Sequence, residues 1–303
     1  MTPWFVVNPN AGGVRGDEIA KTLRRRLAGR EAVISSELPD ASVKGPLLVI
    51  AVGGDGTINR VLNHCDPRRL RLGIIPRGSA NDLGAELRIP ADLHAAFDVI
   101  EAGRSEAIDL VSVNGSRFAT CGGIGLAGQV AMRANRWKSQ QGALGRVVRR
   151  LGPLVYLLST LAETLGRSEP GIGATLRVGR TARRIRLSTA LVSNQPRVGG
   201  FFTPSPEASN RDGMLHLCGL QATRSRARLL WLCAQLLRGR APACTGIFEL
   251  RARSLTLETD ADVTFFGDGE ALAHGRRFRI EVLPGALTVL TQRARMTLSE
   301  EAA

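Results

Sequence analysis

The feature that most constrains the fold is a unit repeated three times in the first third of the chain. Apolar runs at Trp4–Val7, Leu47–Val52 and Leu70–Ile75 each lead into a turn rich in Gly, Asn or Asp, and a helical pattern follows. Continuous apolar runs are typical of strands covered on both faces. Successive strand–turn–helix units predict a parallel, doubly wound sheet, whose turns gather at the carboxyl ends of the strands, where such sheets bind ligands.

The second of these turns, GGDG at 53–56, is the strongest candidate for a ligand site. It ends a buried strand, and helical spacing resumes over 57–63. The first N–H groups of a helix lack intrahelical partners, so this geometry predicts an anion site, with phosphate as the usual occupant. The alternative is a tight turn without a ligand, although three glycines in four residues cost more chain entropy than a plain turn needs.

The pattern changes after Gly103, where short alternating segments replace the long apolar runs. Asn114-Gly115 is a hairpin signal. Further strands at hairpin spacing predict an antiparallel β-sandwich, interrupted by helices near 126–165 and 222–238. We therefore expect an α/β domain over 1–105 and a β-sandwich domain over 106–285, with the tail at 286–303 packing back on the first domain.

Composition limits the partners and the compartment. The 41 Lys and Arg exceed the 27 Asp and Glu, which gives a formal charge of +14 and indicates an anionic partner: nucleic acid, anionic lipid or polyphosphate. With three Trp, one Tyr and nine Phe, a base-stacking reader of single strands is disfavoured, so no nucleic acid partner is expected. Five widely spaced cysteines without a CxxC motif fit a reducing cytosol. The apolar stretches at 151–161 and 229–237 are too short to span a bilayer.

Five segments together resemble a known family. They are VVNPNAGG (6–13), GGDGTINRVLN (53–63), PRGSANDLGAEL (76–87), NRDGMLHL (210–217) and FFGDGEAL (265–272). In this order they resemble the diacylglycerol kinase catalytic family, which includes bacterial lipid kinases and sphingosine kinases. The resemblance implies a two-domain lipid kinase, with an α/β nucleotide-binding domain and a β-sandwich domain for the lipid substrate.

The resemblance also implies which residues hold ATP. Backbone N–H groups of the second turn would cradle the phosphates, and Asp55 would hold Mg²⁺ or orient the phosphate donor. Thr57 has the alternative role of a helix N-cap, and Asn81 and Asp82 have the alternative role of capping the helix that follows them. The full nucleotide-binding set is Asn8, Asn10, Gly53, Gly54, Asp55, Gly56, Thr57, Ile58, Asn59, Gly78, Ser79, Asn81 and Asp82.

Further acidic residues are expected to carry the chemistry. Asp268 and Glu270 are two residues apart, so in an extended segment both would face one side. The alternative is a surface β-turn. By resemblance, Glu270 is the base that takes the lipid hydroxyl's proton, Asp268 supports it, and Asp109 is a further active-site acid. The resemblance also implies a structural Mg²⁺ on the Asp212 carboxylate and the carbonyls of Ser209 and Met214, whereas Asp212-Gly213 alone would equally suit a hairpin turn.

The stretch from Leu110 to Ala162 contains no acidic residue. Its GIGLAG segment (123–128) therefore lacks the carboxylate of a dinucleotide fingerprint, and we expect it to serve close backbone approach. Several Arg and Lys surround Trp137, and an apolar run follows at 151–158. Such a segment can lie on anionic lipid, and an ordinary solvated helix is the alternative.

We therefore expect a cytoplasmic enzyme at the inner face of the membrane, which transfers the γ-phosphoryl of ATP to the primary hydroxyl of diacylglycerol or a related lipid. A homodimer is left open. Residues 35–46 are shorter than in the family and lack its usual helix, which puts nucleotide contacts at Ser35 and Ser36 in question. The alternatives are an NAD kinase-like enzyme and an inactive basic module that binds membranes or nucleic acid.

Overall fold

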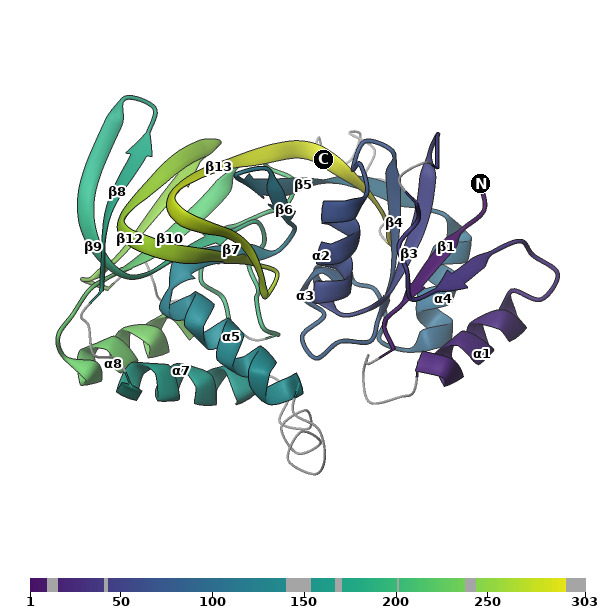
Figure 1. Cartoon of the computed structure of the whole chain (residues 1–303), viewed down its shortest axis with the longest axis horizontal. Coiled ribbons are helices and arrows are strands. Elements are labelled where there is room, and N and C mark those ends of the chain that lie inside the picture. The colour runs from purple at the N-terminus through teal and green to yellow at the C-terminus, as the bar shows by residue number, and fades with distance from the viewer. Residues whose placement is uncertain are drawn as a thin grey trace, which may run out of the picture. The chain divides into compact units, whose positions relative to one another are not determined.

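The computed structural model describes residues 1–9, 16–40, 43–139, 154–166, 171–200, 202–237 and 244–292. The chain divides into two compact units (Figure 1). The first comprises Met1–Ile108 and the segment that begins at Gly285, and the second comprises Asp109–Pro284. These limits lie close to the predicted domain boundaries. Within the described ranges, every helix is too short or too polar to cross a bilayer.

The first unit is built on a parallel sheet. β2 (Val33–Ser35), β1 (Trp4–Val7), β3 (Leu47–Gly53) and β4 (Leu70–Pro76) lie side by side in that order, and all neighbours are parallel. The end of β13 (Glu270–Leu290) adds a further parallel neighbour to β4, with Thr288 opposite Arg71. This order places the carboxyl ends of β1, β3 and β4 at one edge of the sheet.

Helices on both sides cover this sheet. In Figure 1, α2 (Asp55–His64) and α3 (Asp82–Glu86) lie on one side, and α1 (Gly16–Arg26) and α4 (Leu93–Ala102) lie on the other. The α2 residues with the predicted helical spacing are buried, and the Phe97 ring of α4 stacks on Phe5 of β1 at 6.1 Å. Apolar faces at helical spacing therefore hold each helix to the sheet.

The second unit consists mainly of antiparallel ladders. Its strands are β5 (Ser105–Val113), which begins in the first unit, β6 (Ser116–Phe118), β7 (Cys121–Gly125), β8 (Ile172–Val178), β9 (Thr181–Ser193), β10 (Leu215–Gln221), β11 (Ile247–Ala252), β12 (Ser254–Gly267) and most of β13. Strands β7, β9, β8 and β12 pair in a closed ring, and β10 and β11 extend it from β9. Helices α5 (Leu126–Ser139), α7 (Leu154–Gly166) and α8 (Arg226–Leu237) also belong to this unit.

Three phenylalanine rings pack together among the aliphatic side chains that form the core of the second unit. The rings of Phe118 and Phe278 flank that of Phe265, with centroids 6.0 Å and 5.6 Å apart. A Cβ at Gly123 would lie 2.1 Å from the carbonyl oxygen of Ala190, so β7 and β9 approach too closely for any side chain there. The GIGLAG segment thus serves close backbone approach, as expected.

The two-domain architecture predicted from the sequence is confirmed. Asn114-Gly115 forms the turn between β5 and β6, with φ of 49° and 93°. Between β2 and β3, the described residues 36–40 and 43–46 form no helix, as the short segment predicted.

Candidate nucleotide site and acidic residues

The second glycine turn leads directly into α2. Gly54 is the N-cap, with extended backbone, and no side chain caps the helix. Thr57 is therefore not the N-cap, contrary to the alternative considered above. It is buried in the first turn, where its hydroxyl accepts a hydrogen bond from the Asn8 amide at 3.3 Å. The Thr57 and Ile58 N–H groups donate to the Gly54 carbonyl at 2.9 Å and 3.2 Å. The positive end of the helix dipole lies at this turn, which suits an anion.

The second and third turns touch through their glycines. A Cβ on Gly54 would lie 2.8 Å from the Gly78 Cα, and a Cβ on Gly78 would lie 2.4 Å from the Gly54 Cα. The N–H of Arg77 also donates to the Gly53 carbonyl at 2.8 Å. Contact between the two backbones leaves no room for a side chain at either glycine.

The Asp55 carboxylate joins the same two turns. It accepts hydrogen bonds from the N–H groups of Asp82 at 3.1 Å and Leu83 at 3.3 Å, which open α3. In this structure, Asp55 therefore caps α3 from the neighbouring turn. The sequence predicted a role for Asp55 with Mg²⁺ or the phosphate donor, but not this capping role.

Asn81 holds the third turn closed. Its side-chain oxygen accepts from the Gly78 N–H at 2.7 Å, and its amide donates to the Gly78 carbonyl at 2.9 Å. Asn81 is the N-cap of α3 by position, with φ of 52°, but its side chain makes no capping bond. The alternative capping role of Asn81 is therefore wrong for its side chain.

The other predicted nucleotide residues occupy varied positions. Exposed Ser79 belongs to the third turn, whereas Gly56 lies in the first turn of α2, and Ile58 and Asn59 are buried in α2. The Asn59 side chain accepts from the Asn63 amide at 3.1 Å, so it serves the helix. Asn10 lies outside the described residues.

Asp268 and Glu270 do not lie in an extended segment, so the prediction that both face one side is wrong. Gly267 pairs with Glu270, and Asp268 and Gly269 form the turn between them, with φ of 52° and 83°. The Asp268 carboxylate is buried and accepts from the N–H groups of Ala119 and Thr120 and from the Thr120 hydroxyl at 2.7 Å. Glu270 is exposed at the start of β13. Two-residue turns between strands favour Asp-Gly because both positions need positive φ.

Asp109 is buried, and its carboxylate accepts from the Gly213 N–H at 2.8 Å. Next to Gly213, the Asp212 carboxylate accepts from the Met214 N–H at 3.0 Å. It also contacts His216 at 3.2 Å and pairs with the Arg251 guanidinium at 3.1 Å.

This arrangement does not fit the predicted Mg²⁺ site on Ser209, Asp212 and Met214. The Arg251 guanidinium already compensates the Asp212 charge, and His216 contacts the same carboxylate oxygen. A hard cation prefers several oxygen ligands. We therefore derive no step through a metal at Asp212.

Sequence reasoning missed Arg77. It follows Pro76 at the end of β4, beside the two glycine turns, and its Nε is buried without a hydrogen-bond partner among the described residues. A buried guanidinium N–H normally finds an acceptor. Its position in the PRGSAND turn, next to the predicted nucleotide residues, could have identified Arg77 as a candidate site residue from the sequence.

The charge of Arg77 also affects the pKa of Asp92, the N-cap of α4. The pKa of Asp92 is lowered from its ordinary value mainly by the hydrogen bond from the Ala95 N–H, and the charge of Arg77 adds to this effect.

Comparisons with known proteins assign the class. Residues 2–113 match the model of the diacylglycerol kinase catalytic domain, and residues 125–291 match that of the YegS C-terminal NAD kinase beta sandwich-like domain. A parallel α/β unit with paired glycine turns, followed by this second domain, defines a two-domain lipid kinase. The chain belongs to the YegS-like lipid kinase family.

Relatives in this family share much of the chain. A probable lipid kinase YegS-like of Pectobacterium atrosepticum is 32% identical over 79% of this chain and 76% of that protein. A relative of the same description from Yersinia pestis is 28% identical over 88% of this chain and 86% of its own length.

Solved structures share the fold. The crystal structure of a diacylglycerol kinase from Bacillus anthracis has a TM-score of 0.71 at 23% identity, covering 96% of this chain and 97% of that one. An NAD kinase from Archaeoglobus fulgidus in complex with ATP has a TM-score of 0.50 at 13% identity, covering 96% and 94%.

Proposed function

We propose that the protein uses ATP to phosphorylate the primary hydroxyl of diacylglycerol or a related lipid. The observation that carries this proposal is the pair of touching glycine turns at the start of α2. They leave backbone N–H groups at a helix N-terminus, and Asp55 and Asn81 fix the loops around them. Such positioned donors suit a phosphate chain.

In the proposed reaction, the lipid hydroxyl oxygen attacks the γ-phosphorus of ATP, the bond from that phosphorus to the β,γ-bridging oxygen breaks, and ADP leaves. The turn at 53–56 binds the phosphates, and Arg77 offers its buried Nε–H to a phosphate oxygen. Positioning and charge stabilisation supply most of the rate enhancement in phosphoryl transfer, and the Mg²⁺ that accompanies ATP would neutralise phosphate charge.

Glu270 is the proposed base for the hydroxyl proton. It is exposed at the first position of β13, so a substrate can reach it. Asp268 takes a positioning role, because its buried carboxylate fixes the turn from which Glu270 projects. Asp109 similarly fixes the loop that contains Gly213.

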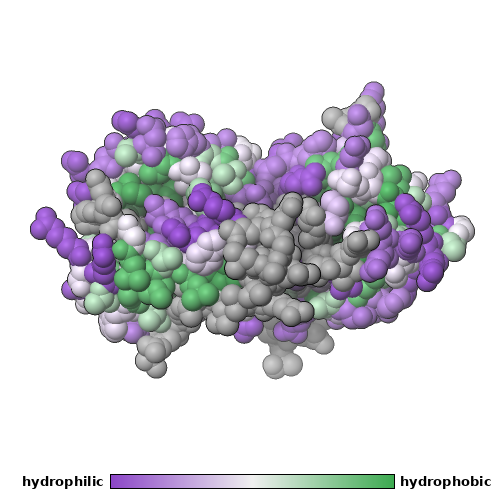
Figure 2. Space-filling model, turned by 60° about the horizontal axis from the view of Figure 1, so that its bottom comes forward, coloured by the Kyte–Doolittle hydropathy of each residue, from purple (hydrophilic) through white to green (hydrophobic). Residues whose placement is uncertain are grey.

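The enzyme would meet its lipid at a membrane surface through helices α7 and α8. Leu158, Leu161 and Leu165 lie at helical spacing on α7 and are each more than two-fifths exposed, and Trp231 of α8 is half exposed. Figure 2 shows apolar surface gathered on this part of the second unit. Exposed apolar patches of this kind mark contact sites for lipid or protein.

The predicted interfacial Trp137 is less suited to this role. It is half-buried, and the Arg133 guanidinium lies 5.7 Å from its ring centroid. The basic and apolar residues at 140–153 lie outside the described residues.

A labelled-ATP assay with a panel of acceptors tests the proposal. Purified protein would be incubated with γ-³²P-ATP and, separately, diacylglycerol, monoacylglycerol, a sphingoid base and NAD. We expect label in an extractable lipid phosphate. Label in NADP alone would support the NAD kinase-like alternative, which the fold shared with the archaeal NAD kinase favours. Salt-sensitive vesicle binding without turnover would support the inactive module.

A further inference from the structure

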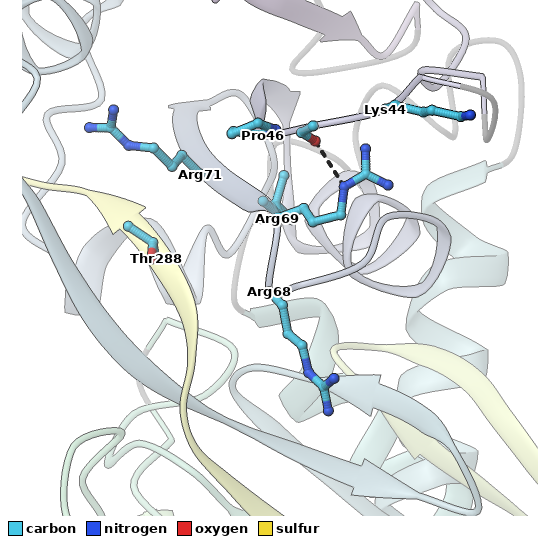
Figure 3. Close-up of a pocket in the computed structure, with 8 residues that line it drawn as sticks. Lys44, Pro46, Arg68, Arg69, Arg71 and Thr288 are labelled. Carbon is cyan, nitrogen blue, oxygen red and sulfur yellow. Dashed lines mark hydrogen bonds between the residues drawn. The ribbon is translucent and has the colours of Figure 1, made fainter.

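A basic cavity in the first unit has no role in the reaction proposed above. It has a volume of about 580 Å³ and is lined by Lys44–Pro46, Arg68–Arg71 and Thr288 (Figure 3). Its walls come from the segments that enter β3 and β4, which begin at Leu47 and Leu70. The glycine turns follow the opposite ends of these strands. Seven residues of strand span roughly 20 Å, so this cavity is separate from the nucleotide turn.

The four cationic side chains around the cavity differ in how many hydrogen bonds they make and in how exposed they are. Arg69 is fixed, because its Nε donates to the Gly45 carbonyl at 2.8 Å and its Nη2 donates to the Val43 carbonyl at 2.5 Å. Arg71 makes one long bond, at 3.3 Å, to the Gly103 carbonyl. Lys44 and Arg68 are exposed. Arg69 thus anchors the loop before β3, whereas Lys44 and Arg68 are exposed and Arg71 is partly exposed.

Carboxylates do not compensate these charges within the described ranges. None of the four cations forms an ion pair there. Asp66 is close in sequence, and its carboxylate accepts the N–H of Arg68 at 3.1 Å. Uncompensated cations around a concave surface attract anions, and the guanidinium fork matches phosphate oxygens.

The arrangement of the charges indicates the size of the ligand. In Figure 3, the ends of Lys44, Arg68 and Arg71 point in different directions around the cavity rather than toward one point. A spread of charges like this suits a ligand with several phosphate groups better than a single phosphate. Thr288 lies opposite Arg71 in the β4–β13 ladder and adds a hydroxyl donor on that side.

We propose that this cavity is a second anion site, which binds a ligand that presents several phosphate groups. A soluble polyphosphate and the neighbouring headgroups of an anionic lipid surface share this chemistry. Binding here does not depend on the catalytic proposal, because the site uses none of the residues assigned to catalysis.

The test uses the full-length chain in three forms: wild type, Arg68→Gln with Arg71→Gln, and Arg24→Gln with Arg25→Gln. The last pair lies exposed on α1 of the same unit and removes the same charge. Hydrogen–deuterium exchange with mass spectrometry would be measured with inorganic tripolyphosphate. Co-sedimentation would be measured with vesicles of phosphatidic acid in phosphatidylcholine.

With tripolyphosphate, we expect slower exchange in peptides covering 43–47 and 66–71 of the wild type and of the Arg24/Arg25 variant. In the Arg68/Arg71 variant, the apparent affinity at these peptides should fall about tenfold or more, while any protection at 53–57 is unchanged. If lipid headgroups are the source, the same variant alone should lose vesicle binding. Equal binding by all three forms with both probes, or protection at 53–57 only, would overturn the proposal.

Discussion

At the residue scale, the acidic side chains divide by the donors that surround them. Asp55, Asp109 and Asp268 each accept backbone N–H groups from a segment distant in sequence. Their carboxylates therefore fix loops, whatever chemistry takes place nearby. Among the acidic residues predicted to be catalytic, Glu270 differs because its side chain is exposed. Spacing alone could not separate these roles, because a carboxylate's partners depend on tertiary contacts.

Replacing Asp268 with Asn should destabilise the second unit. The amide would turn an NH₂ donor toward a pocket of donors, so one or more buried N–H groups would lose their acceptor. We expect a loss of about 1–3 kcal/mol in the free energy of unfolding, measured by urea denaturation. Asp262→Asn, at an exposed pair with Arg276, is the control. Unchanged stability in Asp268→Asn would contradict the structural role.

Asp92 supplies a pH-dependent part of the stability. Hydrogen bonds from the N–H groups of Ala95 and His94 lower its pKa, so its contribution is present above the ordinary Asp range and is lost as the pH falls through the folded-state pKa. Asp92→Ala should lower Tm at neutral pH, and the difference from wild type should shrink in acid. Asp92→Asn keeps a capping oxygen and should stay near wild type at neutral pH. A deficit in Asp92→Ala that persisted in acid would exclude this explanation.

At the scale of elements, much of the first unit follows from local pattern. The apolar runs predicted β1, β3 and β4, and the glycine turn before Thr57 predicted the start of α2. The contact between Gly54 and Gly78 could not be predicted, because it joins turns that are distant in sequence. Spacing alone left the segment at Asp268–Glu270 open between an extended segment and a turn, and the structure shows a turn at Asp268-Gly269.

Gly54→Ala tests the contact between the two turns. The Gly54 backbone lies outside the left-handed region, so an alanine there causes no backbone strain. Its only effect is the steric clash of the added methyl with the Gly78 Cα. Backbone atoms cannot move aside cheaply, so we expect about 1–3 kcal/mol of destabilisation and weaker ATP binding, measured by thermal unfolding with and without ATP. At Gly166, the last residue of α7, no described atom lies within 4 Å of an added Cβ, so Gly166→Ala should not destabilise the protein and should leave ATP binding unchanged. Wild-type ATP binding in Gly54→Ala would contradict the proposed site.

At the scale of the whole molecule, the chain combines a nucleotide-type α/β unit, a β unit with an apolar helical face, and a net charge of +14. Periodicity was enough to predict the two units, and the resemblance of five ordered segments to a known family was enough to predict a lipid kinase. They could not locate the basic cavity, since Lys44, Arg68 and Thr288 come together only when β3, β4 and β13 align.

The central claim is that this protein transfers phosphate from ATP to a lipid with Glu270 as the base. The most direct measurement follows γ-³²P-ATP into a total lipid extract, with wild type, Glu270→Gln and the control Glu281→Gln, which lies exposed on the same strand. We predict a labelled lipid phosphate with wild type and Glu281→Gln, and a rate lower by about 10²–10⁴-fold with Glu270→Gln. No labelled lipid with any form, or equal rates with all three, would contradict the claim.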